Sequence, residues 1–337
     1  SSIRNQLGHE VGISVEPCRR DTFPAIALAA VYLKDVQGID PKEVVIVCPV
    51  DPYVENSYFQ MLRRLGEQAA TCSANLVLMG IEPTYPSEKY GYIIPKDTGT
   101  VSDVLEFKEK PDLERAKAYM GQGALWNGGV FAFKLEYVLE QAHKMIDFTD
   151  YYDLFDKYSS LDKISFDYAV AEKEPKIQVM RFAGQWKDLG TWNTLTEAMG
   201  ENIVGDAIMD GTCTNVHVIN EISVPVLAMG LHNVVISASA DGILVSDKAQ
   251  SSYIKPFVDK LDQQVMYAEK SWGSFRVLDL EQGGMTVKVT LKPGHKMNYH
   301  SHKNRDEIWT VISGTGRTIV DGMEQEVCAG DVVTMQA

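Results

Sequence analysis

Residues 44–51 read VVIVCPVD, a short β-branched run that ends in a carboxylate. An all-apolar run of this length is typical of a strand that is buried on both faces of a sheet. The spacing of apolar residues predicts a helix over residues 56–70, and residues 75–79 predict a second buried strand. Repeated strand–helix–strand units continue to about residue 201, so we predict an α/β domain whose parallel or mixed sheet is covered on both faces.

The pattern changes after residue 202. Short β-prone pieces follow one another over residues 203–262, which predicts a small β-rich domain that stacks as an antiparallel or β-helical unit. A short helix is expected near residues 254–261. From residue 263 the chain is all β, with Gly and Asp-Gly turns between its strands. We therefore expect three domains, over residues 1–202, 203–262 and 263–337.

Composition excludes several classes of protein. The 337 residues include 32 Lys and Arg against 46 Asp and Glu, a formal net charge of −14, whereas nucleic-acid binders need a basic surface. The longest strongly apolar run, residues 24–33, is far shorter than the roughly 20 residues that span a membrane, and no signal peptide is visible. Five scattered cysteines are typical of reduced thiols. We expect a cytoplasmic protein that binds neither nucleic acid nor membrane.

Two carboxylates follow predicted strands. Asp51 closes the strand quoted first, and Asp188 follows the short segment 185–187. Ligands of open α/β sheets bind at the carboxyl ends of strands, so these two side chains could hold Mg²⁺ together. The alternative is structural: Asp51 would cap the turn before Pro52, and Asp188 would cap the helix that starts near Thr191.

Two further segments place polar groups beside tight turns. Lys110 could neutralise a phosphate while Glu109 accepts hydrogen bonds from sugar hydroxyls, or both could belong to a solvated turn. In WNGGVFAF, residues 126–133, two glycines would let a ligand approach the backbone, and Asn127 offers both a donor and an acceptor. The alternative here is a tight turn into a core strand.

Taken in order, these segments resemble the sugar-phosphate nucleotidylyltransferases, and specifically the mannose-1-phosphate guanylyltransferase family. The matching segments are EPCRRDTFPAIA (16–27), YGYI (90–93), EKP (109–111), WNGGVF (126–131), SFDYAV (165–170) and WKDLGTW (186–192). Six motifs in the right order form a specific signal. The resemblance implies a Rossmann-like nucleotide-diphospho-sugar transferase domain that converts GTP and mannose 1-phosphate into GDP-mannose and pyrophosphate.

The resemblance also implies roles for individual residues. Asp51 and Asp188 would bind Mg²⁺, and with Lys110 they would form the catalytic set. The residues implied for the sugar phosphate are Gly91, Glu109, Lys110, Asn127 and Gly128. Those implied for the nucleotide, near its guanine and ribose, are Glu16, Arg20, Asp21 and Thr22. The sugar phosphate is already a nucleophile, so catalysis would consist of in-line alignment and charge neutralisation.

Some positions depart from the family pattern. Pro52 stands where the family has His, Asp21 where it has Asn, and Gly128 where it has Ser. In addition, residues 1–15 do not match the family's Gly-rich loop, whose backbone N–H groups cradle the nucleotide phosphates. We therefore expect a fragment that lacks this loop.

The last part of the chain carries a second motif. Residues 294–314 fit G-x5-H-x-H-x4-E-x6-G, the first metal motif of the cupin β-barrels. His300 and His302, two apart on a predicted strand, would point to one face, where Glu307 could join them around Zn²⁺, Mn²⁺ or Fe²⁺. Residues 270–277 resemble the start of a type II phosphomannose isomerase domain, which implies a bifunctional enzyme. The second cupin motif would follow residue 331, so we expect a partial barrel.

The leading hypothesis is a transferase of GDP-mannose and polysaccharide biosynthesis that bears a cupin domain. A second is a cupin mannose-6-phosphate isomerase whose α/β domain binds a sugar nucleotide as a regulator. A third is a non-catalytic interaction module, and a transferase for another sugar nucleotide also stays open. Residues 203–262 carry no chemical motif, so packing or self-association as a homo-oligomer is their expected role.

Overall fold

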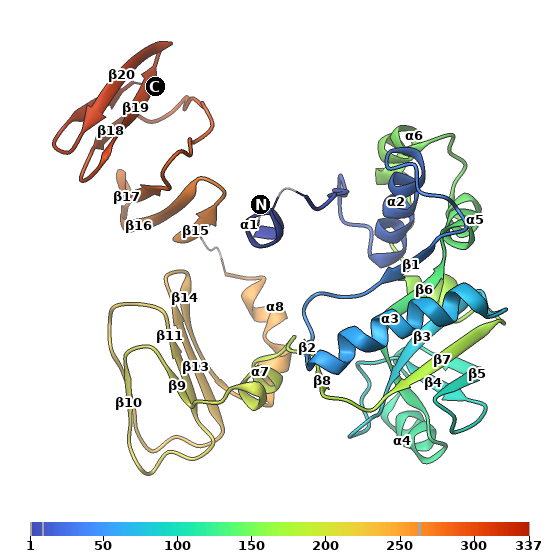
Figure 1. Ribbon diagram of the computed structural model, residues 1–337. Coiled ribbons are helices and arrows are strands. Elements are labelled where there is room, and N and C mark those ends of the chain that lie inside the picture. The colour runs from blue at the N-terminus through green and yellow to red at the C-terminus, as the bar shows by residue number, and fades with distance from the viewer. Residues whose placement is uncertain (1, 9, 262–263, 337) are drawn as a thin grey trace. The chain divides into compact units, whose positions relative to one another are not determined.

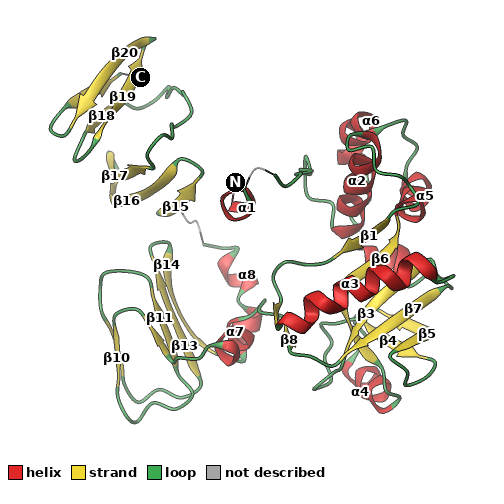
Figure 2. Ribbon diagram, viewed as in Figure 1, coloured by secondary structure: helices red, strands yellow, loops and turns green. Residues whose placement is uncertain are grey.

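The computed structural model describes residues 2–8, 10–261 and 264–336 (Figures 1 and 2). The chain divides into two compact units. The larger comprises residues 12–239 and 243–261. The smaller contains α1 (Ser2–Leu7), residues 240–242 and the chain after residue 261. The boundaries predicted at residues 202 and 262 remain a prediction.

A six-stranded sheet forms the centre of the larger unit. Its strands, in the order in which they pair, are β1 (Val44–Val47), β6 (Leu125–Lys134), β3 (Leu76–Ile81), β7 (Ile177–Phe182), β5 (Val101–Lys108) and β4 (Tyr92–Pro95). β3 and β7 run parallel, whereas β6 is antiparallel to both β1 and β3, and β5 is antiparallel to both β7 and β4. The predicted mixed sheet is confirmed.

Helices cover both faces of this sheet (Figure 2). One face is covered by α2 (Thr22–Asp35), α5 (Leu135–Met145) and α6 (Tyr151–Lys157), and the other by α3 (Asn56–Thr71) and α4 (Leu113–Gly121). Successive side chains of a strand point to opposite faces. In β3, Leu76 and Leu78 therefore belong to the first core and Val77 and Met79 to the second. Every β3 residue is buried, which confirms the predicted buried strand for residues 76–79; Asn75, the first residue of that prediction, is exposed and precedes β3.

The first quoted strand, β1, differs from its prediction. It is half-buried along its whole length rather than buried on both faces. β1 lies at the edge of the sheet and pairs with β6, from Val44 opposite Lys134 to Val47 opposite Phe131. An edge strand is covered less completely than a central one. The apolar sequence of β1 therefore predicted more burial than the structure shows.

Two helix starts follow local capping rules. Asp21 is the N-cap of α2, and its side chain accepts a hydrogen bond from Thr22 N at 2.8 Å. Its φ of 71° lies in the left-handed region, which few non-glycine residues adopt. α7 (Trp192–Ala198) is capped by Thr191, whose Oγ1 accepts from Thr194 N at 3.3 Å. The structural alternative for Asp188, a cap of this helix, is therefore wrong.

A parallel β-solenoid follows α7. Of the two arrangements predicted for this segment, antiparallel and β-helical, the structure shows the β-helical one. Its strands are β9 (Ile203–Val204), β10 (Ala207–Met209), β11 (His217–Asn220), β12 (Val226–Ala228) and β13 (Val234–Ser239), and β14 (Gly242–Asp247) pairs with β13 at the edge of the sheet. β11 pairs in parallel with β9 and β13, and β10 pairs in parallel with β12. Val216, Val218, Ala228 and Ile236 form its core.

The helix predicted over residues 254–261 is shorter than expected. A 3₁₀ turn, η3 (Gln250–Tyr253), leads into α8 (Lys255–Val258). Beyond it, Lys260 N bonds to Phe257 O at 3.1 Å and Leu261 N to Val258 O at 2.9 Å. These bonds span three residues, as in a turn, rather than the four of an α-helix.

The smaller unit is built mainly of antiparallel strands, as predicted. β15 (Tyr267–Lys270), β16 (Gly273–Glu281) and β17 (Gly284–Leu291) form one sheet, while β18 (Glu307–Thr310) pairs with β21 (Val332–Met335) and β19 (Thr315–Val320) with β20 (Met323–Cys328). The predicted strand through His300 and His302 is wrong. Residues 294–306 pair with no strand that the structure describes, so alternation along a strand does not orient these two rings.

Membrane-spanning helices and disulfide bonds are both absent from the described ranges, residues 2–8, 10–261 and 264–336. No helix there combines the length and hydrophobicity that a membrane crossing requires. All five cysteines are free thiols, as their scattered positions predicted.

A buried basic pair lies inside the solenoid. Lys248 and His217 are only 3% and 7% exposed. Lys248 Nζ donates to Asn215 Oδ1 at 2.6 Å and lies 2.8 Å from His217 Nδ1. The ammonium can donate to this nitrogen only while the imidazole is neutral. Burial lowers the pKa of His217, and the charge of Lys248 lowers it further.

We predict that the solenoid loses stability as the pH falls below about 6.5, the ordinary pKa of histidine. The unfolded chain then binds a proton at His217 that the folded chain does not bind, so the free energy of unfolding decreases. Hydrogen exchange of β11 and β13, combined with thermal melts between about pH 7.5 and 5.5, measures this loss. His217→Gln keeps an acceptor without titrating and should flatten the dependence. Parallel pH profiles for the two proteins would contradict the prediction.

Candidate active site

A pocket of about 220 Å³ lies in the larger unit and is lined by residues from six separate segments. Six of the predicted site residues line it: Asp51, Gly91, Glu109, Asn127, Gly128 and Asp188. Lys89, Tyr90, Asp167 and Trp186 also line it, and none of these was assigned a role from the sequence. The tertiary structure thus gathers side chains that are up to 137 positions apart, from Asp51 to Asp188.

A short ribbon lies beside the two carboxylates that the sequence placed at strand ends; β1 ends at Val47, so Asp51 lies four residues beyond it. β2 (Tyr53–Val54) pairs antiparallel with β8 (Trp186–Lys187), with Tyr53 opposite Lys187. Asp51 lies just before β2 and Asp188 directly follows β8, and both residues line the same pocket. Asp188 Oδ1 also accepts a hydrogen bond from Gly190 N at 2.8 Å, which orients its carboxylate.

Glu109 and Lys110 form an ion pair beside the pocket. Lys110 Nζ lies 3.0 Å from Glu109 Oε1, while Glu109 Oε2 is buried and has no partner among the described residues. Burial raises the pKa of Glu109, and the neighbouring Asp167 adds to that rise. For Lys110, burial is the largest single effect and lowers the pKa, but the hydrogen bond and charge of Glu109, with the charges of Tyr168 and Asp167, together raise it.

The backbone of this turn is strained. Lys110 has a φ of 45°, in the left-handed region, and it precedes Pro111, a position that favours extended backbone. Glu172 holds the turn, because its Oε1 accepts from Glu109 N at 2.9 Å and lies 3.1 Å from Lys108 Nζ. Strain that the surrounding structure maintains is a common property of functional turns.

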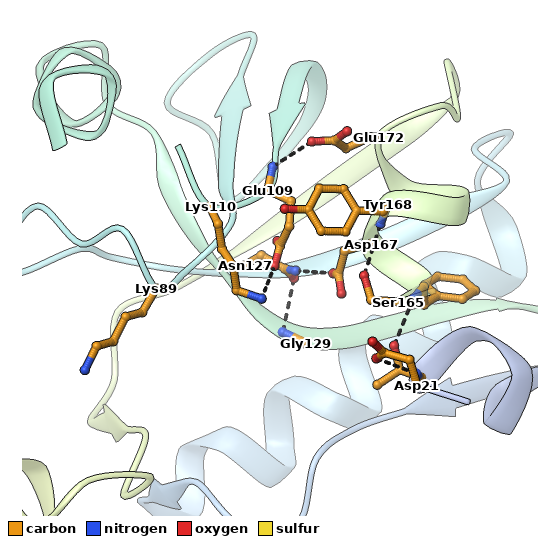
Figure 3. Close-up of polar contacts among 12 residues, drawn as sticks. Asp21, Lys89, Glu109, Lys110, Asn127, Gly129, Ser165, Asp167, Tyr168 and Glu172 are labelled. Atoms are coloured by element: carbon orange, nitrogen blue, oxygen red, sulfur yellow. Dashed lines mark hydrogen bonds and ion pairs between the residues drawn. The ribbon is translucent and has the colours of Figure 1, made fainter. Parts of the chain in front are cut away.

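Asn127 lies on β6 with its amide bonded at both ends (Figure 3). Its Nδ2 donates to Asp167 Oδ1 at 2.6 Å, and its Oδ1 accepts from Gly129 N at 3.1 Å. Asp167 opens η2 (Asp167–Ala171), a π-helical turn. Burial raises the pKa of Asp167, while the bond from Asn127 opposes the rise. Asp167 belongs to the SFDYAV motif, which was the only sequence signal that could have revealed it.

Gly91 makes room for the Glu109 carboxylate. A Cβ at position 91 would collide with Glu109 Oε2 and would lie 3.2 Å from Asn127 Cβ. Gly91 O also accepts a hydrogen bond from Asn127 N at 2.8 Å. At Gly128, where the family pattern has Ser, a Cβ would lie 3.1 Å from Ile81 Cγ1, which is a tight contact.

The predicted nucleotide-binding segment is anchored elsewhere. Tyr158 OH donates to Glu16 Oε2 at 2.8 Å, Arg20 donates to Ser159 O, and Phe166 N donates to Thr22 Oγ1 at 2.9 Å. Tyr158 and Ser159 belong to the 3₁₀ turn η1 (Tyr158–Ser160). In the described structure none of Glu16, Arg20, Asp21 and Thr22 lines the pocket, although Asp21 is close enough to raise the pKa of Asp167. Their contact with a nucleotide stays a prediction.

The cupin motif is only partly assembled. His302 Nε2 lies 2.9 Å from Glu307 Oε1, and the rings of His300 and His302 have centroids 5.0 Å apart. Arg305 Nη2 lies 2.8 Å from His302 Nε2 and 2.9 Å from Glu307 Oε1. Across residues 2–8, 10–261 and 264–336, no group of three or more His, Cys, Asp or Glu side chains is arranged to hold a metal ion.

We predict that Gly91→Ala destabilises the larger unit by about 1–3 kcal/mol, because the new methyl group must displace the Glu109 carboxylate. Urea unfolding measures the change. Gly121→Ala is the matched control, since a Cβ there meets nothing within 4 Å. Equal midpoints for the two variants would show that the Gly91 contact is easily relieved.

Similarities to known proteins agree with the family resemblance that the motifs indicate. The nucleotidyl transferase family matches residues 2–203, and the cupin domain family matches residues 287–337. A putative mannose-1-phosphate guanylyltransferase of Vibrio cholerae serotype O1 is 31% identical over 350 residues, which cover 94% of this chain and 74% of that protein. An Escherichia coli mannose-1-phosphate guanylyltransferase is 31% identical over 347 residues, covering 93% and 72%.

One solved structure is similar over most of the chain. It is a Thermus thermophilus protein described as a mannose-1-phosphate geranyltransferase, with a TM-score of 0.64 at 26% identity. The alignment covers 77% of this chain and 81% of that one.

Proposed function

Because this chain belongs to the nucleotidyl transferase family, and within it to the mannose-1-phosphate guanylyltransferases, we propose that it makes GDP-mannose and pyrophosphate from GTP and mannose 1-phosphate. The observation that carries the proposal is the convergence of Asp51, Glu109, Asn127 and Asp188 on one pocket. The relatives favour this transferase over a regulatory or non-catalytic α/β domain and over a transferase for another sugar nucleotide.

The reaction needs alignment more than proton transfer. An oxygen of the sugar phosphate attacks the α-phosphorus of GTP in line, a new P–O bond forms, and the bond to the β-phosphate breaks as pyrophosphate leaves. The attacking oxygen is already anionic at neutral pH. The protein therefore has to hold two polyanions in line and offset their mutual repulsion.

The two strand-end carboxylates fit a divalent cation. Asp51 and Asp188 offer oxygen ligands at one pocket, and Mg²⁺ in nucleotide enzymes is commonly bound by one or two carboxylates plus substrate phosphates. When bound there, Mg²⁺ would neutralise phosphate charge. Asp188 is already oriented by its bond from Gly190 N, and Asp51 would supply the partner ligand.

Lys110 and Glu109 would divide the recognition of the sugar phosphate. The Lys110 ammonium, held 3.0 Å from Glu109 Oε1, has further donors for a phosphate oxygen. Glu109 lines the pocket and its Oε2 lacks a partner among the described residues, so this oxygen would accept a hydrogen bond from a sugar hydroxyl. Gly91 and Gly128 line the same pocket, and the missing side chain of Gly91 leaves room for the Glu109 carboxylate.

We predict that Asp188→Ala lowers pyrophosphate release roughly 100-fold with GTP, Mg²⁺ and mannose 1-phosphate, because it removes a charged ligand from the reacting phosphates. Release is followed with a coupled pyrophosphatase assay. Asp162→Ala, an exposed acidic residue outside the pocket, is the control and should leave the rate unchanged. Undiminished activity of Asp188→Ala would contradict the proposed mechanism.

We propose a second activity, the interconversion of mannose 6-phosphate and fructose 6-phosphate, because residues 270–277 resemble the start of a type II phosphomannose isomerase domain and residues 287–337 match the cupin domain family. His300, His302 and Glu307 are the donors that would hold Zn²⁺, Mn²⁺ or Fe²⁺, and two of the three are already in contact. We predict that His300→Ala abolishes isomerisation and leaves pyrophosphate release unchanged, as measured in separate coupled assays. Isomerisation that survives this substitution would contradict the role of His300.

A further inference from the structure

Asp167 is a pocket carboxylate without an assigned role. It comes from η2, 40 positions after Asn127, yet it lines the same pocket as Glu109 and Asn127. Figure 3 shows its carboxylate beside the Asn127 amide, and the two are joined by a hydrogen bond of 2.6 Å. The partner of Asp167 is thus a residue that we place in the sugar-phosphate site.

The Asn127 amide has only one favourable orientation. Its Nδ2 faces the acceptor Asp167, and its Oδ1 faces the donor Gly129 N. Rotating the amide by half a turn would set its oxygen against the Asp167 carboxylate and its NH₂ group against a backbone N–H. Gly129 supplies that N–H from a backbone with φ of 69°, a conformation that suits glycine. Asp167 and Gly129 therefore fix the orientation of the Asn127 amide, with Nδ2 toward Asp167 and Oδ1 toward Gly129.

This orientation has a consequence for ligands. The NH₂ group of asparagine carries two hydrogens, and one of them is donated to Asp167 in a hydrogen bond. Among the described residues the second hydrogen has no acceptor, so it can serve as a donor in a pocket that is otherwise rich in carboxylates. A phosphate or hydroxyl oxygen of the sugar phosphate is an acceptor that fits it.

A carboxylate at position 167 carries a desolvation cost that a purely structural role does not require. Asp167 is half-buried near two other acids, Asp21 and Glu109, and near the cation Lys110. Packing alone would be satisfied by an uncharged side chain, since buried charges are costly to desolvate. An acceptor at this position is explained if it orients a ligand-binding amide.

We propose that Asp167 is a positioning residue of the sugar-phosphate site, which holds the Asn127 amide with one N–H free to bind an acceptor oxygen of mannose 1-phosphate. This inference rests on the proposed function. It adds a residue that acts through Asn127 rather than on the reacting atoms.

A double-mutant cycle tests this role. Kd for mannose 1-phosphate by calorimetry, and kcat and KM for pyrophosphate release, are measured for wild type, Asp167→Ala, Asn127→Ala and the double variant. We expect Asp167→Ala to weaken binding and raise KM about tenfold, the effect of losing one buried hydrogen-bond partner, with a smaller change in kcat. In the Asn127→Ala background the same substitution should change Kd less than about twofold, because its target is gone. Asp162→Asn is the matched surface control.

Conservative variants keep the test decisive. Asp167→Asn retains an acceptor for Asn127 Nδ2 and should restore most of the affinity. The exchanged pair, Asp167→Asn with Asn127→Asp, keeps a hydrogen bond between the two positions but presents a carboxylate to the ligand. It should fold, as judged by its melting temperature, and lose mannose 1-phosphate binding. If Asp167→Ala does not fold, this exchanged pair decides the question.

Three results would overturn the inference. These are multiplicative effects of the two alanine substitutions, unchanged affinity in a folded Asp167→Ala variant, and normal binding by the exchanged pair. A wild-type protein that binds mannose 1-phosphate but releases no pyrophosphate would refute the proposed function instead. The two failures are thus distinguishable.

Discussion

The hydrogen bonding of β6 is the constraint on which the larger unit depends. This strand pairs with β1, β3 and β4, so it joins both ends of the sheet order to its centre. Its residues alternate between the two cores, with Val130 and Ala132 on one side and Phe131 and Phe133 on the other. The same strand carries Asn127, whose position in the pocket is therefore set by the packing of the core. A shift of one residue in its register would reverse both patterns.

The pocket is electrostatically unusual. Among the described residues, its lining includes four carboxylates, those of Asp51, Glu109, Asp167 and Asp188, and one cationic side chain, Lys89, with Lys110 adjoining through its ion pair to Glu109. Such a pocket repels phosphates unless cations are bound. This charge pattern is the physical reason why two of the acids suit a divalent cation while the other two, whose pKa values are raised by burial, suit hydroxyl and amide donors.

Much of the fold could be predicted because local patterns and tertiary demands agree. The Asp21 cap, the helix from Asn56 and the buried strand β3 all follow from short-range rules. Predictions failed where burial depends on neighbours in space: β1 is half-buried because it lies at an edge, and His300 and His302 lie on no paired strand among the described residues. Local sequence carries no information about which strand stands next to another.

For the candidate site, the sequence by itself determined the residue types and their order: strand-end carboxylates, the Glu109–Lys110 turn, Asn127 with its glycines, and thereby the family. Only the tertiary structure decided which of these meet. It brought Asp188 to Asp51 through a two-residue ribbon, placed Asp167 against Asn127, and directed Glu16, Arg20 and Thr22 to bonds with residues 158–166. The physical reason is that hydrogen-bond partners 40 to 144 positions apart are selected by packing of the whole sheet, which no local pattern encodes.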